Sequence, residues 1–280
     1  FMRGDSKVAQ KLLATVVALI VMVPAFGKDS IDVDADIENN LTMAMAWRQT
    51  AAEYRALYHQ GFNLARMRIE LALAQKQDGS LPLAVISDVD ETLLLSNNYW
   101  GYLINRGQDF FDDAIWDSWV VENRAVASPG ALAFLEFCVA NNVEIFYVTN
   151  RNQGEATVQL ALNNLNAAGF PSVDRSHLRV LRETSNKELV QQRIREDYDV
   201  VVLLGDNLND FSRRYYSTDL EQRLSLMEED KARYGRDYII FPNPTDGHWI
   251  RAIFGDSEPP PSDHNRIILK KAATRSAWTP

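Results

Sequence analysis

The chain has 280 residues, and its hydrophobic share of 46% is ordinary for a globular protein with a sizeable core. This length allows one large α/β domain with additions or two small domains. The net charge of −9 and the sequence pI near 5.0 make a nucleic-acid polymer an unexpected partner, because proteins that bind one usually present a basic face. A binding site for an anion would have to be built locally, from Lys side chains, backbone N–H groups or a metal ion.

The first residues have the pattern of a targeting signal. Basic residues come first, at Arg3, Lys7 and Lys11. An uncharged apolar run follows over residues 12–23, and small residues lead to a cleavage point after Gly27. This order is typical of a secretion signal, whereas a membrane-spanning helix, the less favoured alternative, needs about 20 apolar residues. We predict that residues 1–27 are a signal peptide, that the protein is exported to the periplasm or secreted, and that no stable membrane span remains after signal removal.

The chain has one cysteine, Cys138, so no internal disulfide is expected. Cys138 lies in an apolar helical pattern and is interpreted as a core residue. It is far from the cleavage point, so a lipid-anchored N-terminal cysteine is not expected either. The four histidines show no metal-ligand spacing, and zinc is therefore not predicted.

Residues from about 36 to 77 are predicted to be helical, because apolar side chains recur there at helical spacing. Asp78-Gly79-Ser80 ends this pattern. We therefore assign residues 28–80 to an N-terminal helical segment.

Five apolar segments are predicted to be β-strands. They are residues 83–86, 143–148, 178–181, 200–204 and 238–241. Nearly continuous apolar sequence is typical of strands buried on both faces, and alternation with helical stretches indicates a parallel sheet covered by helices. The predicted fold class is α/β, with a doubly wound parallel sheet of the Rossmann type formed by residues 81–256.

A long aromatic insertion, at about residues 93–129, interrupts this domain and is predicted to be a small cap. Its aromatic residues are Tyr99, Trp100, Tyr102, Phe110, Phe111, Trp116 and Trp119. Long insertions in compact domains are often lids or binding loops, so these side chains either pack a small subdomain or line a pocket, and both alternatives stay open. Residues 257–280 are Pro-rich and then basic, and they are predicted to form a flexible tail.

Two aspartates, Asp88 and Asp90, directly follow the first predicted strand. Alternate strand residues face the same side, so both carboxylates can point at one small site. Two carboxylates that close repel each other unless a cation or a proton lies between them. The arrangement fits magnesium-assisted phosphoryl transfer, in which one Asp attacks and the other handles the proton. A short motif of this kind also arises by chance, as an acidic turn after a buried strand.

Three further segments fall where a doubly wound sheet would bring them near this pair. Thr149 and Asn150 end a strand and can hold phosphate oxygens, or they simply begin a turn. Lys187, near a helix start, can neutralise a phosphate or remain a solvated charge. Asp206 and Asp210 follow another strand, where a helix N-cap role would explain one of them at most. Ligands of open parallel sheets bind outside the carboxyl ends of the strands, so one crevice could hold all of these residues.

The order of these motifs, DVDET, VTN, Lys187 and GDNLND, resembles the four motifs of the haloacid dehalogenase (HAD) superfamily. The chain is similar in particular to the bacterial class C acid phosphatases. These share a helical stretch like residues 47–57 and a late Phe241-Pro242-Asn243 segment followed by Trp249. The resemblance covers about residues 40–255.

The resemblance implies a role for each matching residue. Asp88 would be the nucleophile that forms an aspartyl-phosphate, and Asp90 would be the general acid and then the general base. Thr149 and Lys187 would bind the phosphoryl group, with Asn150 nearby. Because Asp90 must be protonated when Asp88 attacks, we expect activity in the acid range.

The same resemblance implies a Mg²⁺ site. The ion would be held by the carboxylate of Asp88, the backbone carbonyl of Asp90 and the carboxylate of Asp206. Asp210 would fix the metal shell or orient Lys187. Carboxylates, water and phosphate oxygens are the ligands that Mg²⁺ prefers.

Two departures from the class C pattern stand out. Many class C enzymes are lipoproteins, but no cysteine follows the signal here, which favours soluble export. The late Pro-Asn segment, which often carries an aromatic residue, reads PNPTDG, so stacking on a nucleotide base stays open. Tyr99, Tyr102 and Trp116 are candidates for contacts with the leaving group.

The sequence therefore predicts an exported, Mg²⁺-dependent acid phosphatase that hydrolyses phosphomonoesters, with nucleoside monophosphates among the candidate substrates. A homo-oligomer is compatible with the sequence. The main alternative is a non-catalytic storage or binding protein on the same fold, but such a protein would lack the nucleophile, and Asp88 is present. A phospho-accepting signalling module also uses Asp, Thr, Lys and Mg²⁺, but the motif order and the export signal do not suit it. A dehalogenase would not need the second aspartate of the pair.

Overall fold

The computed structural model describes residues 39–278, which belong to one compact unit. The predicted signal peptide, residues 1–27, and the following residues up to 38 lie outside the described residues. Within the described part of the chain, no helix combines the length and apolar character needed to cross a membrane.

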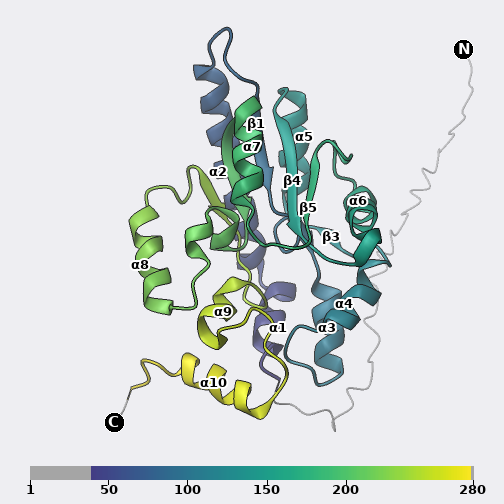
Figure 1. Cartoon of the computed structure of the whole chain (residues 1–280), viewed down its shortest axis with the longest axis vertical. Coiled ribbons are helices and arrows are strands. Elements are labelled where there is room, and N and C mark those ends of the chain that lie inside the picture. The colour runs from purple at the N-terminus through teal and green to yellow at the C-terminus, as the bar shows by residue number, and fades with distance from the viewer. Residues whose placement is uncertain (1–38, 279–280) are drawn as a thin grey trace, which may run out of the picture. The chain divides into compact units, whose positions relative to one another are not determined.

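A five-stranded parallel sheet lies at the centre of the fold (Figure 1). Its strands are β1 (Leu83–Ser87), β4 (Glu144–Asn150), β5 (Leu178–Leu181), β6 (Asp199–Gly205) and β7 (Tyr238–Ile240), in the order β5-β4-β1-β6-β7. All five segments predicted to be strands are strands, within two residues at either end. The central strand β1 pairs with β4 on one side and β6 on the other. After β1 the chain adds β4 and β5 on one side of it and then β6 and β7 on the other. The strand order therefore changes direction at β1, and a doubly wound sheet forms its binding crevice at such a point.

Helices cover both faces of the sheet. The helices between and before the strands are α2 (Ala52–Gln75), α5 (Ala131–Ala140), α6 (Thr157–Ala167), α7 (Glu188–Asp197) and α8 (Leu220–Asp230). Successive residues of β1 point to opposite faces: Val85 packs in the core under α2, α5 and α6, whereas Ile86 packs in the core that Ile194 of α7 completes. The prediction of a doubly wound α/β fold is confirmed.

The N-terminal helical stretch is broken in two. Helix α1 (Thr42–Thr50) ends where Ala51 adopts an extended backbone with ψ 125°, and α2 begins at the next residue. The break lets the two helices pack in different places. Met45 of α1 contacts the aromatic core of the insertion, whereas Tyr58 of α2 packs against the sheet. Helical spacing alone predicted one continuous helix over residues 36–77. The spacing of apolar residues does not show which part of the fold each helical turn packs against, so it did not indicate the break at Ala51.

The insertion between β1 and β4, predicted to be a small cap, contains two short strands and two helices. Strands β2 (Leu94–Leu95) and β3 (Val126–Ala127) pair in antiparallel fashion and enclose α3 (Asn97–Asn105) and α4 (Asp113–Val120). Aromatic side chains of α3, α4 and the loop between them form a separate apolar core, which we call the cap cluster: Tyr99, Trp100, Phe111, Trp116 and Trp119. Mutual packing of these rings, together with buried Leu103 and with Met45 of α1, stabilises the insertion.

The C-terminal residues form two more helices, α9 (His248–Phe254) and α10 (Asp263–Ala273). Helix α10 occupies part of the stretch predicted to be a flexible tail. The Ser262 hydroxyl caps it by accepting a hydrogen bond from the backbone N–H of Asn265, at 3.2 Å. Arg266 makes a bidentate ion pair with the buried carboxylate of Asp109, at 3.0 Å for each hydrogen bond. This long-range pair, which the local sequence does not reveal, attaches α10 to the insertion.

Candidate active site

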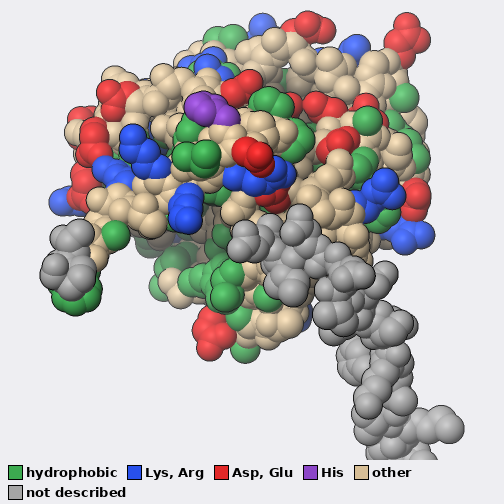
Figure 2. Space-filling model, turned by 90° about the horizontal axis from the view of Figure 1, so that it is seen from below, with side chains coloured by type: hydrophobic (Ala, Val, Ile, Leu, Met, Phe, Trp, Pro, Cys, Tyr) green, Lys and Arg blue, Asp and Glu red, His purple; other side chains and the backbone are tan. Residues whose placement is uncertain are grey.

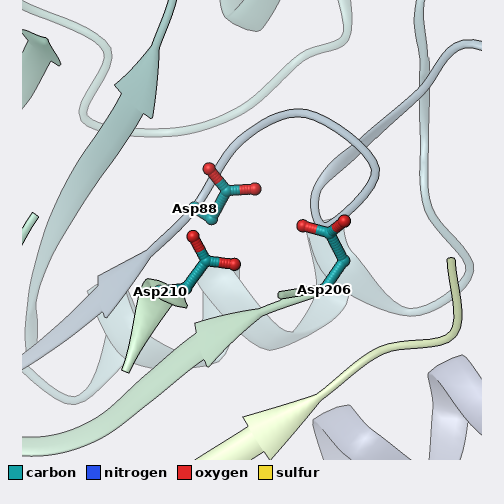
Figure 3. Close-up of side chains that lie close together, drawn as sticks. All are labelled: Asp88, Asp206 and Asp210. Carbon is teal, nitrogen blue, oxygen red and sulfur yellow. The ribbon is translucent and has the colours of Figure 1, made fainter. Parts of the chain in front are cut away.

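Three carboxylates meet at the carboxyl edge of the sheet, where their side chains point toward one another (Figure 3). Asp88 directly follows β1, Asp206 directly follows β6, and Asp210 ends the short 3₁₀ helix η2 (Leu208–Asp210). One oxygen atom from each carboxylate lies within 4.8 Å of the others. Because β1 and β6 are neighbouring parallel strands, the residues after them meet at one edge.

Lys187, just before α7, joins two of these carboxylates. Its Nζ donates hydrogen bonds to the Asp88 carboxylate and to Asp210 Oδ1, the latter at 2.7 Å. Burial lowers the pKa of Lys187, but the charges of Asp210 and Asp88 outweigh burial and leave that pKa above its ordinary value. Lys187 is therefore a permanently charged ammonium group in a buried position. The single positive charge of Lys187 does not balance the charges of three carboxylates, so a further cation would be stabilised among them.

Asp206 has neutral hydrogen-bond partners. Its carboxylate accepts hydrogen bonds from Thr92 Oγ1 at 3.3 Å, Asn207 Nδ2 at 2.8 Å and Asn243 Nδ2 at 2.7 Å. No Lys or Arg of residues 39–278 forms an ion pair with it. Burial and the charges of Asp210 and Asp88 raise the pKa of Asp206 well above its usual range. A half-buried carboxylate in this position is what a divalent cation with oxygen ligands would neutralise, so the residues fit a metal ion.

Burial is also the main reason why the pKa of Asp88 is raised, to about 7, with the charges of Asp210 and Asp90 adding to the shift and Lys187 opposing it. Thr92 Oγ1 donates a hydrogen bond to Asp88 Oδ2 at 3.1 Å. A carboxylate with so high a pKa is protonated at acid pH and cannot then attack. A bound cation would favour the ionised form and thereby keep Asp88 nucleophilic.

Asp90 lies in a separate hydrogen-bonded group that includes one residue the sequence analysis did not assign to the site. Thr149 Oγ1 donates to Asp90 Oδ2 at 3.0 Å. Arg151 forms a bidentate pair with the same carboxylate, through Nε at 2.7 Å and Nη2 at 2.5 Å. Thr149 and Arg151 are two residues apart at the end of β4, so the strand period alone would have placed them on one face.

Arg151 also connects Asp90 to the insertion. Its Nη1 donates to Asn164 Oδ1 of α6 at 2.6 Å. Asn164 Nδ2 in turn contacts the carbonyl of Val120, at the end of α4, at 2.8 Å, and Asn123 Oδ1 at 2.7 Å. The Asp90 carboxylate is thus held by a chain of hydrogen bonds that extends to the cap.

Asn150, predicted to lie near the phosphoryl group, has a different partner. Its side chain is exposed, and Nδ2 donates to the carbonyl of Thr184 at 2.7 Å. Thr184 belongs to the loop that leads to Lys187. In this structure Asn150 therefore ties the end of β4 to the Lys187 loop.

The three predicted leaving-group contacts differ in their surroundings. Tyr99 is fully buried in the cap cluster, and its hydroxyl contacts the backbone of Asp112. Tyr102 is 49% exposed and lines a cavity of about 390 Å³ between α3 and α4, which none of the predicted catalytic, phosphate-binding or metal residues lines. The ring of Trp116 has its centroid 5.9 Å from Arg151 Cζ. Of the three, Trp116 is next to the group that holds Asp90.

Glu91, between Asp90 and Thr92, anchors the loop that carries Asp88 and Asp90. Its backbone is in the left-handed region at φ 62°, which is unfavourable for a residue other than glycine. Its side chain forms a buried ion pair with Arg48 of α1, and Arg48 also donates to Thr245 Oγ1. Tyr58 Oη donates to the Glu91 carbonyl at 2.5 Å. Both N-terminal helices thus hold the loop that carries the two aspartates.

Comparison with known proteins agrees with this geometry. Residues 22–249 match the family model described as "HAD superfamily, subfamily IIIB (Acid phosphatase)". The chain is also similar to the class C acid phosphatase from Bacillus anthracis. The tungstate-bound crystal structure of that protein matches with 29% identity and a TM-score of 0.75, over 85% of this chain and 96% of the other. A second structure of that enzyme matches with 28% identity and a TM-score of 0.76, over 85% of this chain and 97% of the other.

The chain belongs to the subfamily IIIB acid phosphatases of the HAD superfamily. The resemblance inferred from the four motifs is confirmed, and the structural neighbours are class C acid phosphatases, as the motifs predicted.

Proposed function

We propose that this protein is an exported, Mg²⁺-dependent phosphomonoesterase that works through an aspartyl-phosphate on Asp88. The observation that carries the proposal is the convergence of Asp88, Asp206 and Asp210, with oxygen atoms within 4.8 Å, around the buried ammonium group of Lys187. Export rests on the charge and apolar pattern of residues 1–27.

Mg²⁺ is the cation that suits these ligands best, because it prefers carboxylate, water and phosphate oxygens. The carboxylates of Asp88 and Asp206 and the backbone carbonyl of Asp90 would hold it, with Asp210 supporting the shell. When bound, the ion would offset the charge of the substrate phosphate and of the clustered aspartates.

In the proposed first step, a carboxylate oxygen of Asp88 attacks phosphorus, and the bond from phosphorus to the leaving oxygen breaks. Asp90 gives its proton to that oxygen, so the leaving group departs as an alcohol. Lys187 and Thr149 hold the non-bridging oxygens, with Asn150 as a further candidate. Arg151 fixes the direction of the Asp90 carboxylate through its two hydrogen bonds.

In the second step, Asp90 takes a proton from a water molecule, and that water attacks phosphorus of the aspartyl-phosphate. The bond to Asp88 breaks, and inorganic phosphate leaves. Splitting the reaction this way replaces one difficult displacement by two easier ones. Because Asp90 enters the cycle protonated, the rate should be highest in the acid range.

The proposed substrates are small phosphomonoesters, with nucleoside monophosphates as one class to test. Trp116 is the aromatic residue of the three candidates that is best placed to contact the leaving group, since its ring lies beside Arg151.

Hydrolysis of para-nitrophenyl phosphate by the purified chain tests the proposal. We expect activity that EDTA abolishes and Mg²⁺ restores, and that Asp88→Asn removes by a factor of at least about 10³. Asp219→Asn is the matched control, because Asp219 caps α8 and Asn caps equally well. Full activity of Asp88→Asn would contradict the proposed nucleophile.

A further inference from the structure

Two arginines gather on one tyrosine ring beside the candidate active site. Arg213, in the 3₁₀ helix η3 (Arg213–Tyr215), places its Cζ 3.6 Å from the ring centroid of Tyr216. Arg251, in α9, places its Cζ 4.4 Å from the same centroid. The imidazole of His248 packs edge-on against this ring, with centroids 5.1 Å apart. Two guanidinium groups from separate elements thus lie against the same aromatic ring.

These guanidinium groups have little to bind within the protein. Both residues are half-buried, and neither forms an ion pair with any Asp or Glu of residues 39–278. The guanidinium of Arg213 donates one hydrogen bond, from Nη1 to Ser185 Oγ at 2.8 Å, and the backbone N–H of Arg213 donates to Glu188 Oε2 at 3.0 Å. The guanidinium of Arg251 donates none to the described residues, and its Nε is buried without a partner. A buried donor without a partner costs free energy, so an unpaired arginine at this place calls for a ligand.

The excess of acidic residues makes the lack of partners more notable. The chain carries a net charge of −9, and acidic and basic side chains lie side by side on the end of the molecule that carries α9 and α10 (Figure 2). An arginine at this end of the molecule can therefore find a carboxylate partner, as Arg266 does with Asp109. Arg213 and Arg251 instead leave their donors available.

Short chains of hydrogen bonds connect this group to Lys187 and Asp206 from two sides. Ser185, which binds Arg213, accepts a hydrogen bond through its carbonyl from the backbone N–H of Lys187 at 3.1 Å. The backbone N–H of His248 donates to Asn207 Oδ1 at 2.7 Å, and Asn207 Nδ2 donates to Asp206 at 2.8 Å. The group formed by the two arginines and Tyr216 is therefore connected to Lys187 through Ser185 and to Asp206 through His248 and Asn207.

We propose that Arg213 and Arg251, oriented by the ring of Tyr216, bind a second phosphate group on the leaving-group portion of the substrate. The planar fork of a guanidinium matches phosphate oxygens, and stacking on an aromatic ring fixes its direction. The preferred substrates are then phosphomonoesters that carry a second phosphate. This inference rests on the proposed function, because it concerns a second phosphate on the substrate whose first phosphate Asp88 attacks.

The test compares kcat/KM for release of the 5′-phosphate from adenosine 3′,5′-bisphosphate and from adenosine 5′-monophosphate. We expect the wild type to favour the bisphosphate about tenfold, the effect of one well-formed charged contact. Arg251→Gln and Arg213→Gln, made separately, should bring this ratio close to one while kcat for the monophosphate stays within about threefold. Arg236→Gln is the matched control, since it removes the same charge from an exposed arginine before β7.

A wild type that treats both substrates alike would overturn the inference, as would a preference that survives both substitutions or falls equally in the control. Hydrolysis of para-nitrophenyl phosphate separates this failure from failure of the proposed function, because that substrate has no second phosphate. If one variant fails to fold, the other still measures the ratio.

Discussion

The carboxyl edge of the sheet and the cap cluster are both largely shielded from solvent, but the first is built from charged groups and the second from aromatic rings. At the sheet edge, Asp88, Asp206 and Asp210 crowd their charges around Lys187. In the cap cluster, aromatic rings pack against one another, as Tyr99 does edge-on against Trp116 with centroids 5.2 Å apart. The first arrangement costs folding free energy, because like charges are removed from water, whereas the second provides it.

The difference indicates which region serves chemistry and which serves stability. Substitutions at the sheet edge should change kcat strongly and affect stability in either direction. Substitutions in the cap cluster other than Trp116, whose ring lies beside Arg151, should change stability and leave kcat nearly unchanged.

Lys187→Met should give the largest effect. It leaves the buried carboxylates without their ammonium partner, so we expect kcat to fall about a thousandfold and the free energy of unfolding to fall by about 3–5 kcal/mol. Steady-state kinetics and urea denaturation measure the two quantities. Lys231→Met is the control, because Lys231 is exposed and pairs only loosely with Glu228, at 3.5 Å. Equal effects of the two substitutions would show that the position of Lys187 is not special.

Asp206→Asn should separate activity from stability. We expect at least a hundredfold loss of activity at a fixed Mg²⁺ concentration, but a metal-free protein that melts about 3–6 °C higher at pH 7. The pKa of Asp206 is raised in the folded state, so ionisation of this carboxyl group opposes folding. The wild type therefore loses stability as the pH rises above the pKa of an ordinary, unfolded-state carboxyl group.

The melting-temperature difference between Asp206→Asn and the wild type should therefore grow from pH 4 to pH 7 in EDTA. Added Mg²⁺ should reverse its sign, since only the wild type binds the ion well. A difference that does not vary with pH would contradict the conclusion that burial and neighbouring carboxylates disfavour the ionised form of Asp206.

Arg151→Lys should give an intermediate effect. Lysine keeps the charge near Asp90 but cannot make the bidentate pair, nor reach Asn164 at the same time. We expect kcat to fall about 10- to 100-fold because the Asp90 carboxylate is less well directed. The acid–base profile of kcat should change together with its magnitude. Arg236→Lys supplies the control, and a wild-type profile in Arg151→Lys would exclude a positioning role for Arg151.

Tyr99→Phe should give the smallest effect and tests the other side of the comparison. It removes a hydroxyl that contacts the carbonyl of Asp112 at 3.1 Å and its N–H at 2.9 Å, which should cost about 1 kcal/mol of stability. We expect kcat to stay within about twofold of the wild type. A large loss of activity would show that Tyr99 takes part in catalysis, as the sequence analysis allowed. Tyr102→Phe, at an exposed position, should change neither quantity.

The sequence predicted the sheet well because its strands are continuous apolar segments with turn residues at both ends. It also identified Asp88, Asp90, Lys187, Asp206 and Asp210, because each follows a strand or precedes a helix within a short motif. The end of a strand and the start of a helix are local features, so the sequence alone shows which residues lie there. Their catalytic roles stay proposals until the substitutions above are measured.

Residues that act across long sequence distances were not identified in this way. Arg151 binds Asp90 over 61 positions of sequence, and Arg48 binds Glu91 over 43. The helices of the insertion and α10 were missed for the same reason. Their apolar and charged side chains find partners in other parts of the chain, as Arg266 finds Asp109.

The sequence by itself determined the fold class, the order of the strands along the chain and the carboxylates that could share one site, because strand ends and motif spacing are local properties. Only the tertiary structure decided which cations reach those carboxylates and which do not. It paired Lys187 with Asp88 and Asp210 and paired Arg151 with Asp90. It left the guanidinium groups of Arg213 and Arg251 without an ion-pair partner among the described residues. Such pairings depend on distances through space, which the sequence does not contain.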